Sequence, residues 1–201
     1  MNGDRRSDLS VAAVVLAAGA SSRLGRAKQL LNFAGKRLVR HVVDAADVCS
    51  PIIVVVGAQA GGVLEALAGS EAQAVENPGW REGIASSLRR GILALPERVD
   101  AAIVLLCDQP AVSRALLQTL IATQRNTGKL IVGCRWDDAV GPPALFLREC
   151  FPALLALSGD VGARSILGNA GDDVALVEFP DGNIDVDTPE DWARWRARSK
   201  A

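Results

Sequence analysis

The sequence predicts an α/β fold, a three-layer α/β/α domain around a mostly parallel, doubly wound sheet. Four short runs are apolar throughout and rich in valine, isoleucine and leucine, which is typical of strands that are buried on both faces. Segments with helical spacing separate them, and strands that alternate with helices favour parallel strands covered on both sides. The expected strands are 11–16, Ile52–Val56, Ala101–Leu106 and 130–134, and the expected helices are 38–48, 62–68, 84–95 and 114–124.

Length and composition indicate one domain, residues 1–201, since about 100–200 residues suffice for one complete core. The chain has 22 basic and 23 acidic side chains and a formal net charge of -1, which predicts no broad positive field for nucleic acid or anionic lipid. The four cysteines form no CxxC pair, so we expect neither a zinc site nor a disulfide framework, and a cytoplasmic setting. No apolar run approaches the roughly 18 residues of a membrane span, and the polar N-terminus lacks the apolar core of a signal peptide.

The first strand runs into a loop that carries glycine, serine and basic residues, "AAVVLAAGASSRLGRAKQLL" (12–31). Open α/β sheets bind ligands at the carboxyl ends of their strands, where this loop lies. Glycines allow backbone N–H groups to approach an anion, while the hydroxyl and basic side chains add donors and charge. The stretch is neither GxGxxG nor GxxxxGK[ST]. The residues alone leave a phosphate-binding loop and a plain strand-to-helix connection equally open; those concerned are Gly19, Ser21, Ser22, Arg23, Gly25, Arg26 and Lys28.

Aspartates follow two later segments. In "AAIVLLCDQPAV" a buried strand ends near Asp108, which would face the same crevice as the first loop. Mg²⁺ is commonly held by one or two carboxylates together with substrate phosphates, and we favour that role over a cap for a helix beginning near Val112. In "NIDVDTPED", Asp185 and Asp187 share a face if the stretch is extended, although the residues alone favour turn and capping roles. A last helix is expected near Thr188, with Thr188 as its cap.

The remaining candidates are weaker on local chemistry. "NPGWREGIASSLRRG" offers Gly83, Ser86 and Ser87 to an anion or a sugar, and "GDVGAR" offers Gly162 and Arg164, although each segment by itself favours ordinary helix capping over a ligand site. After about residue 133 the pattern loosens into loops and shorter elements. The single His41 has no evident nucleophilic partner, and Cys107 is expected to be packed rather than reactive. The residues therefore favour positioning and charge neutralisation, as phosphoryl-type transfer requires.

Six segments, in order along the chain, resemble the molybdenum cofactor cytidylyltransferases, which are related to the molybdopterin guanylyltransferases. They are "LAAGASSRLGRAKQLL" (16–31), "NPGWREGIASSL" (77–88), "CDQPAV" (107–112), "GPPALF" (141–146), "GDVGAR" (159–164) and "DVDTPEDW" (185–192). The resemblance implies a Rossmann-like nucleotidyltransferase (glycosyltransferase-A-like) fold. It also implies Mg²⁺-dependent transfer of CMP from CTP to the terminal phosphate of molybdopterin, with release of pyrophosphate.

The resemblance further implies roles for individual residues, with nucleotide binding over about 11–112 and acceptor binding over about 113–187. Lys28, Arg23 and Asp108 would be catalytic, and Asp108 would hold the metal with Asp185, or with Asp187 in reserve. Ala18 favours cytidine over guanosine. The remaining nucleotide-binding residues would be Leu16, Ala17, Gly19, Ser21, Ser22, Gly83, Ser86 and Ser87, and the acceptor-binding residues Gly141, Pro142, Gly162 and Arg164.

The expected partners are CTP, a molybdopterin-type substrate and a client molybdoenzyme. Two alternatives remain open: transfer of a guanylyl or other nucleotidyl group to a different phosphorylated acceptor, such as a sugar phosphate, and a non-catalytic protein that binds and delivers nucleotide or cofactor.

Overall fold

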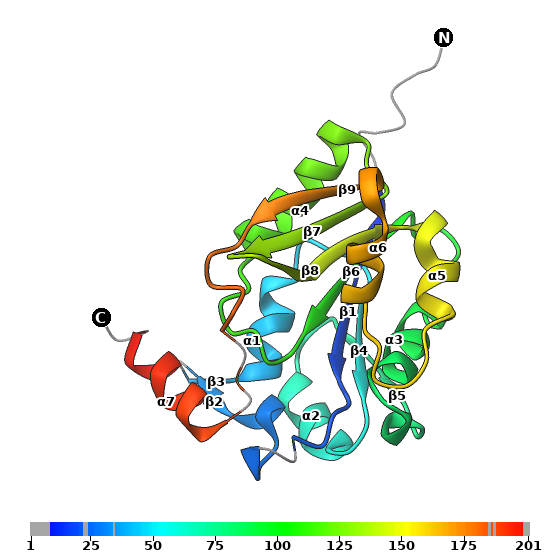
Figure 1. The fold of residues 1–201 in the computed structure, drawn as a ribbon. Helices are drawn as coiled ribbons and strands as arrows, with labels where there is room; N and C mark the ends of the chain where they lie inside the picture. Colours follow the sequence, from blue (N-terminus) through cyan, green and yellow to red (C-terminus); the bar gives the residue numbers. More distant parts are fainter. Residues whose placement is uncertain (1–8, 22–23, 34, 185, 187, 199–201) are drawn as a thin grey trace.

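A computed structural model describes residues 9–21, 24–33, 35–184, 186 and 188–198. Its centre is a seven-stranded sheet in the order β5-β4-β1-β6-β8-β7-β9, with helices on both faces (Figure 1). Only β8 runs antiparallel to its neighbours in the described sheet. The predicted α/β class, with a mostly parallel sheet, is confirmed. No helix among the described residues is long and apolar enough to cross a membrane.

The predicted apolar runs form the middle of the sheet. β1 (Val11–Ala17) lies between β4 (Ile52–Val56) and β6 (Ala101–Leu106), parallel to both, and every residue of β1 is buried. The chain passes from β1 through β4 to β5 (Gln73–Glu76) on one side, and β6 then pairs with the other side of β1. The order of strands therefore reverses at β1. Such a reversal opens a crevice at the carboxyl ends of the two strands, where open α/β sheets bind their ligands.

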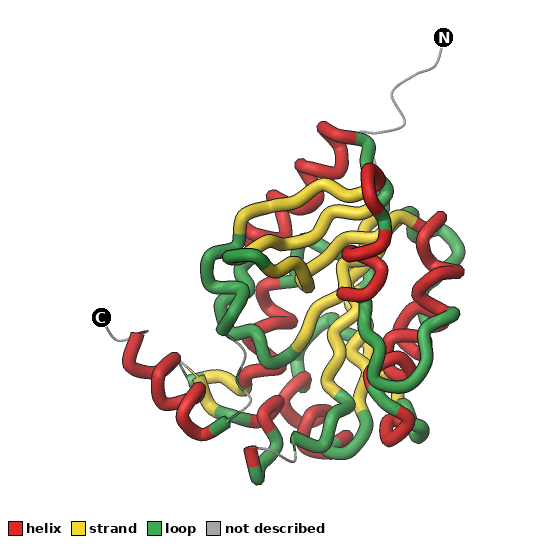
Figure 2. Tube along the Cα trace, viewed as in Figure 1, coloured by secondary structure: helices red, strands yellow, loops and turns green. Residues whose placement is uncertain are grey.

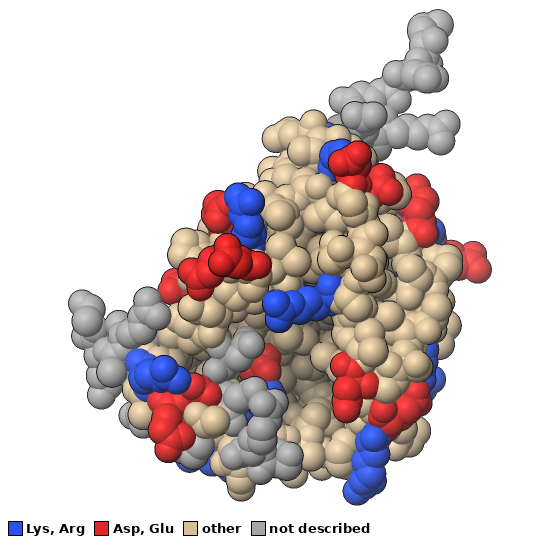
Figure 3. Space-filling view, viewed as in Figure 1, with Lys and Arg blue, Asp and Glu red and all other residues tan. Residues whose placement is uncertain are grey.

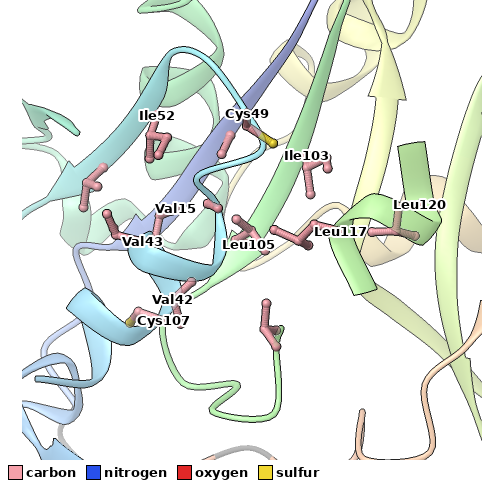
Figure 4. Packing of buried hydrophobic residues seen from close by; sticks show 14 of the residues in the cluster. Val15, Val42, Val43, Cys49, Ile52, Ile103, Leu105, Cys107, Leu117 and Leu120 are labelled. Carbon is pink, nitrogen blue, oxygen red and sulfur yellow. The ribbon is translucent and has the colours of Figure 1, made fainter. Parts of the chain in front are cut away.

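Two hydrophobic clusters, one on each face, hold the helices to the sheet. Alternate residues of β1 enter opposite clusters, with Val15 in one and Val14 in the other, as the two-residue period of a strand requires. The cluster that contains Val15, part of which Figure 4 shows, includes side chains of α1 (Leu38–Ala45), α2 (Ala60–Leu67) and α4 (Arg114–Thr127). The other includes side chains of α3 (Ile84–Leu93), α5 (Phe151–Leu155) and α6 (Arg164–Asn169).

The region expected to consist of loops and shorter elements contains a long hairpin and an edge strand. β7 (Ile131–Trp136) turns into β8 (Ala139–Leu147), and β9 (Val174–Glu178) pairs with β7. β8 carries Pro142 and Pro143 although it lies between two strands. Its pairing with β7 is irregular at that point, where Leu145 faces Val132 but Gly141 faces Cys134. The prolines, which lack an N–H group, fall at this irregularity, where regular ladder bonds are interrupted.

A small subdomain closes one end of the molecule. Strands β2 (Asn32–Phe33) and β3 (Lys36–Arg37) form a short hairpin, and α7 (Pro189–Arg198) lies beside it (Figures 1 and 2). Phe33 packs on Trp192 and Trp195 of α7. Thr188 caps α7 as predicted, since the N–H of Asp191 donates to its Oγ1 and its own N–H donates to Asp191 Oδ2.

Candidate active site

The loop after β1 is held by a buried glutamine. Gln29, in a short 3-10 helix (Lys28–Leu30), is fully buried, and its Nε2 donates to the carbonyl oxygens of Ala17 at 3.0 Å and Gly19 at 2.6 Å. Ser21 Oγ donates to Gln29 Oε1 at 3.1 Å and accepts from the N–H of Lys28 at 3.0 Å. These bonds tie both ends of the loop to the end of β1. The loop therefore has a defined form, and Lys28 a defined place.

Lys28 and Asp108 meet although 80 positions separate them in the sequence. The Lys28 ammonium donates to Asp108 Oδ2, and the two side chains are only 17% and 14% exposed. Lys28 comes from the loop after β1 and Asp108 from the turn after β6, so the pair lies in the crevice that the strand order predicts. An ion pair so shielded from water interacts more strongly than one on the surface.

Asp108 does not cap the helix that follows it, which excludes the alternative considered from the sequence. The N-cap of α4 is Ser113, whose Oγ accepts from the N–H of Leu116 at 3.2 Å. The second oxygen of Asp108, Oδ1, is buried and has no hydrogen-bond partner among the described residues. A buried, unpartnered carboxylate oxygen is costly unless a ligand satisfies it. A divalent cation fits there, because such ions take carboxylate oxygens in crevices that also hold phosphates.

The segment that contains the other candidate metal ligands reaches the same place. Val186 is buried, and its N–H donates to the carbonyl oxygen of Asp108 at 3.0 Å. Asp185 and Asp187 themselves lie outside the described residues, as do Ser22 and Arg23 of the first loop.

A cavity of about 880 Å³ surrounds the Lys28–Asp108 pair. Figure 3 shows this face of the molecule hollowed at its centre, with basic and acidic side chains around the hollow. Five further residues that the sequence analysis assigned to the nucleotide line the cavity: Leu16, Ala18, Gly19, Gly83 and Ser87. Ala17, Ser21 and Ser86 are not among its lining residues. The structure also adds lining residues that the sequence analysis did not select, namely Ala20, Gln29, Trp80, Arg81, Ile84, Leu106, Cys107 and Asp160.

A buried amide organises the wall opposite the first loop. Asn77 Nδ2 donates to Ser86 Oγ at 2.9 Å and to Ser87 Oγ at 3.0 Å, and Asn77 Oδ1 accepts from the N–H of Gly79 at 3.0 Å. The Ser86 hydroxyl also lies 2.8 Å from the carbonyl oxygen of Gly83. Ser86 is thus committed to the turn before α3, whereas Ser87 faces the cavity.

Gly83 adopts φ 121° and ψ 178°, a region that side chains rarely enter. A Cβ there would lie 2.3 Å from the carbonyl oxygen of Gly159, so only glycine allows the loop after α5 to pack so closely against the start of α3. That loop carries Asp160 into the wall of the large cavity. Gly83 therefore lines the large cavity and also allows the loop after α5 to pack against the start of α3.

A second cavity, of about 130 Å³, adjoins the first and shares Leu16, Ile84 and Leu106 with it. Pro142, Gly162 and Arg164, three of the four residues predicted to bind the acceptor, line this smaller cavity. The fourth, Gly141, lies against the Trp136 ring, since a Cβ at Gly141 would fall 2.6 Å from Trp136 Cη2. The structure adds Gln109 and Trp136 to its lining.

The cysteines and the histidine play packing roles. All four cysteines are free and buried. The pKa of the Cys107 thiol is raised to about 12, mainly by burial and also by the neighbouring Asp108 carboxylate, while Lys28 acts to lower it. His41 packs edge-on against Phe33, with Nε2 3.2 Å from the carbonyl oxygen of Pro110. Their expected structural roles are therefore consistent with their surroundings.

The chain is similar to several known proteins. The family described as "MobA-like NTP transferase domain" matches residues 13–174. Nicotine blue oxidoreductase of Paenarthrobacter nicotinovorans is 32% identical over 92% of this chain and 95% of its own length. Molybdenum cofactor cytidylyltransferase of Escherichia coli is 25% identical over the same shares of the two chains.

Solved structures share the fold of this chain. Rv0371c of Mycobacterium tuberculosis superimposes with a TM-score of 0.81 and 32% identity, covering 94% of this chain and 98% of that one. The same protein has also been solved in a complex with manganese, with a TM-score of 0.77, 29% identity and coverage of 94% and 98%.

Proposed function

Because the chain belongs to the MobA-like NTP transferase family and is therefore a nucleotidyltransferase, we propose that it transfers CMP from CTP to the terminal phosphate of molybdopterin. One observation carries the proposal: the half-buried Lys28–Asp108 pair lies in a cavity of about 880 Å³ that adjoins a second, mainly apolar cavity. Two adjoining cavities suit a reaction between two substrates. The division into a nucleotide part, about 11–112, and an acceptor part, about 113–187, belongs to the same proposal.

In this reaction a terminal phosphate oxygen of the acceptor attacks the α-phosphorus of CTP. The bond between the α-phosphorus and its bridging oxygen to the β-phosphorus breaks, and pyrophosphate leaves with the electron pair. The attacking phosphate is already ionised at neutral pH, so no general base is required. The residues need only align two anions and spread their charge, which is how most phosphoryl-type transfers are accelerated. Lys28 neutralises phosphate charge in the crevice, with Arg23 assigned the same task.

The similar protein Rv0371c has been solved in a complex with manganese, and we propose Mg²⁺ for this chain, held by Asp108 together with Asp185, or with Asp187 in reserve. The unpartnered Asp108 Oδ1 and the bond from Val186 to the Asp108 carbonyl support this set. When bound, the ion would neutralise phosphate charge and orient the triphosphate. Lys28 then has a second task, since its ammonium holds the Asp108 carboxylate in place.

The choice of CTP rests on Ala18. This residue is 3% exposed, its carbonyl accepts from the N–H of Ala58 at 3.0 Å, and it lies in the wall of the large cavity. A Cβ placed on Gly57 would lie 2.9 Å from the Ala18 Cβ, so the alanine methyl group fills the space beside the loop after β4. We propose that this filled wall favours the smaller cytosine ring. A cytoplasmic setting, supported by four free cysteines, and a client molybdoenzyme complete the proposal.

The deciding experiment measures pyrophosphate release from CTP and from GTP, with molybdopterin and Mg²⁺. We expect release with CTP to exceed release with GTP, and to depend on molybdopterin. Pyrophosphate release that is the same with and without molybdopterin, or that is larger with a sugar phosphate than with molybdopterin, would favour a different acceptor. Nucleotide binding with no release would favour the non-catalytic delivery protein.

A matched pair of lysine variants tests the site. Lys28→Ala should reduce kcat/KM by at least about a hundredfold, as removal of one stabilising group in an active site typically does. Lys36→Ala removes a lysine that also pairs with an aspartate, Asp44, at 2.5 Å, but its side chain is 59% exposed and lies outside both cavities. The control should retain wild-type rates. Equal rates in the two variants would remove Lys28 from the reaction.

A further inference from the structure

We propose that Asp160 distinguishes cytosine from uracil in the larger cavity, by accepting a hydrogen bond from the exocyclic amino group of cytosine. The inference rests on the proposed function, because it concerns the base of the nucleotide that is proposed to bind there. The wall at Ala18 is proposed to favour a small ring over a purine, but the ring of uracil has the same size as that of cytosine. Separating these two bases therefore needs a polar group in the cavity wall.

The Asp160 carboxylate is accessible to a ligand in this cavity. Asp160 is exposed, and it is one of four charged residues in the lining. Two of the others, Lys28 and Asp108, pair with each other. The third, Arg81, places its guanidinium over the Trp80 ring, 4.3 Å from the ring centroid. Asp160 makes no hydrogen bond or ion pair within the part of the chain that the structure describes, so its oxygens remain available to a ligand.

The backbone holds Asp160 next to Gly83, which is assigned to the nucleotide. The N–H of Ala85 donates to the carbonyl oxygen of Gly159 at 3.1 Å. A Cβ on Gly83 would lie 2.6 Å from Asp160 Oδ1. Figure 1 shows the loop between α5 and α6 passing beside the start of α3, where these contacts lie. The carboxylate thus has a defined place at the start of α3.

This place is on the side of the cavity that contains Ala18. A Cβ on Gly57 would lie 2.9 Å from Ala18 Cβ and 3.0 Å from Trp80 Cβ, so Ala18 and Trp80 are near neighbours. The N–H of Gly83 donates in turn to the Trp80 carbonyl at 3.3 Å. A continuous series of contacts therefore joins Asp160 to the residue that is proposed to select the base.

Asp160 lines the larger cavity and not the smaller one. Gly162 and Arg164, which follow it in the same segment and are assigned to the acceptor, line the smaller cavity. The segment thus contributes Asp160 to the nucleotide side and the later residues to the acceptor side. This division favours the base over the acceptor as the ligand of Asp160.

The chemistry of a carboxylate selects one pyrimidine over the other. A carboxylate in a cavity that binds a triphosphate repels the ligand unless it meets a donor on another part of it. The ionised group only accepts hydrogen bonds. Cytosine presents an amino group, for which an aspartate is a suitable acceptor, whereas uracil has a carbonyl oxygen in the same place on the ring. Two acceptors that face each other repel, so Asp160 favours CTP and rejects UTP.

Calorimetry of CTP and UTP binding, with Mg²⁺ and without molybdopterin, tests the inference. We expect the wild-type protein to bind CTP at least about tenfold more tightly than UTP. Asp160→Asn keeps the shape of the side chain, but its amide can present either a donor or an acceptor to the base. The ratio of the two affinities should therefore fall close to one, mainly because UTP binds more tightly to the variant.

Asp172→Asn is the matched control. It removes the same charge from an exposed aspartate in a short 3-10 helix, Gly171–Asp173, outside both cavities, and should keep the wild-type ratio. If Asp160 only repels the triphosphate, Asp160→Asn raises both affinities equally and leaves the ratio unchanged, which overturns the inference. A wild-type ratio near or below one, or an equal fall in the two variants, also overturns it.

These binding measurements require no transfer, so the inference and the proposed function fail separately. A CTP preference that Asp160→Asn removes, without CMP transfer to molybdopterin, would refute the proposed function alone. CMP transfer together with a ratio that Asp160→Asn leaves unchanged would refute this inference alone. If that variant then raised only KM for molybdopterin, Asp160 would belong to the acceptor site instead.

Discussion

Replacement of Gly83 by alanine should damage stability and acceptor use together. The backbone at Gly83, with φ 121°, is strained for any side chain, at a cost of about 1–3 kcal/mol. The new Cβ would also fall 2.3 Å from the Gly159 carbonyl oxygen and 2.6 Å from Asp160 Oδ1. Overpacking of this kind costs about 1–3 kcal/mol where the neighbour can shift. Because a surface loop relaxes more easily than a core, we expect the free energy of unfolding to fall by about 2–4 kcal/mol.

The new Cβ would displace the loop after α5, and this displacement links the loss of stability to function. That loop continues to Gly162 and Arg164, which line the smaller cavity. We therefore expect KM for the acceptor to rise about tenfold in Gly83→Ala, because a displacement of about 1 Å in a positioning residue is costly in rate. KM for CTP should rise as well, because Gly83 and Asp160 line the larger cavity.

Chemical denaturation and steady-state kinetics measure the two effects. Gly61→Ala is the matched control: Gly61 lies in α2 with no atom within 4 Å of a new Cβ, so alanine should stabilise the protein by about 0.5–1 kcal/mol. A Gly83→Ala variant that unfolds at the same denaturant concentration as wild type, with an unchanged KM for the acceptor, would show that the loop contact is dispensable.

Three further substitutions test other parts of the structure. Gln29→Leu removes the donors to the Ala17 and Gly19 carbonyls, so the free energy of unfolding should fall by about 2–3 kcal/mol and KM for CTP should rise; an unchanged KM in steady-state assays would mean that the loop holds its form without Gln29. Thr188→Ala removes the cap of α7 and should lower the denaturation midpoint by an amount equivalent to about 1 kcal/mol, whereas no change would mean that packing alone holds the helix. The pKa of Cys107 is about 12 in the folded chain against an ordinary 9.0, so its contribution to stability is complete below pH 9.0 and lost as the pH rises toward 12. Cys107→Ala should accordingly weaken the alkaline fall of the unfolding free energy in denaturation measured from pH 8 to 11, and an equal fall in both proteins would contradict the assigned burial.

The sequence predicted the centre of the sheet better than its edges. β4 and β6 have the predicted bounds, because a short, continuous apolar run is a local signal of a fully buried strand. The edge strand β5, Gln73–Glu76, is largely exposed and shows no such run. β8 was missed because Pro142 and Pro143 argue against an interior strand, and only the irregular pairing with β7 accommodates them.

Residue types alone supplied the candidates for the site, a lysine after the first strand and an aspartate after a later one, both where parallel strands end. They left a phosphate-binding loop and a plain connection equally open. Only the tertiary structure decided which groups meet. It joined Lys28 to Asp108 across 80 positions and placed Gln29 under the loop. The physical reason is that a strand or helix pattern depends on near neighbours in the chain. A cavity depends on which distant side chains fail to fill the space between two loops, and no local pattern records that.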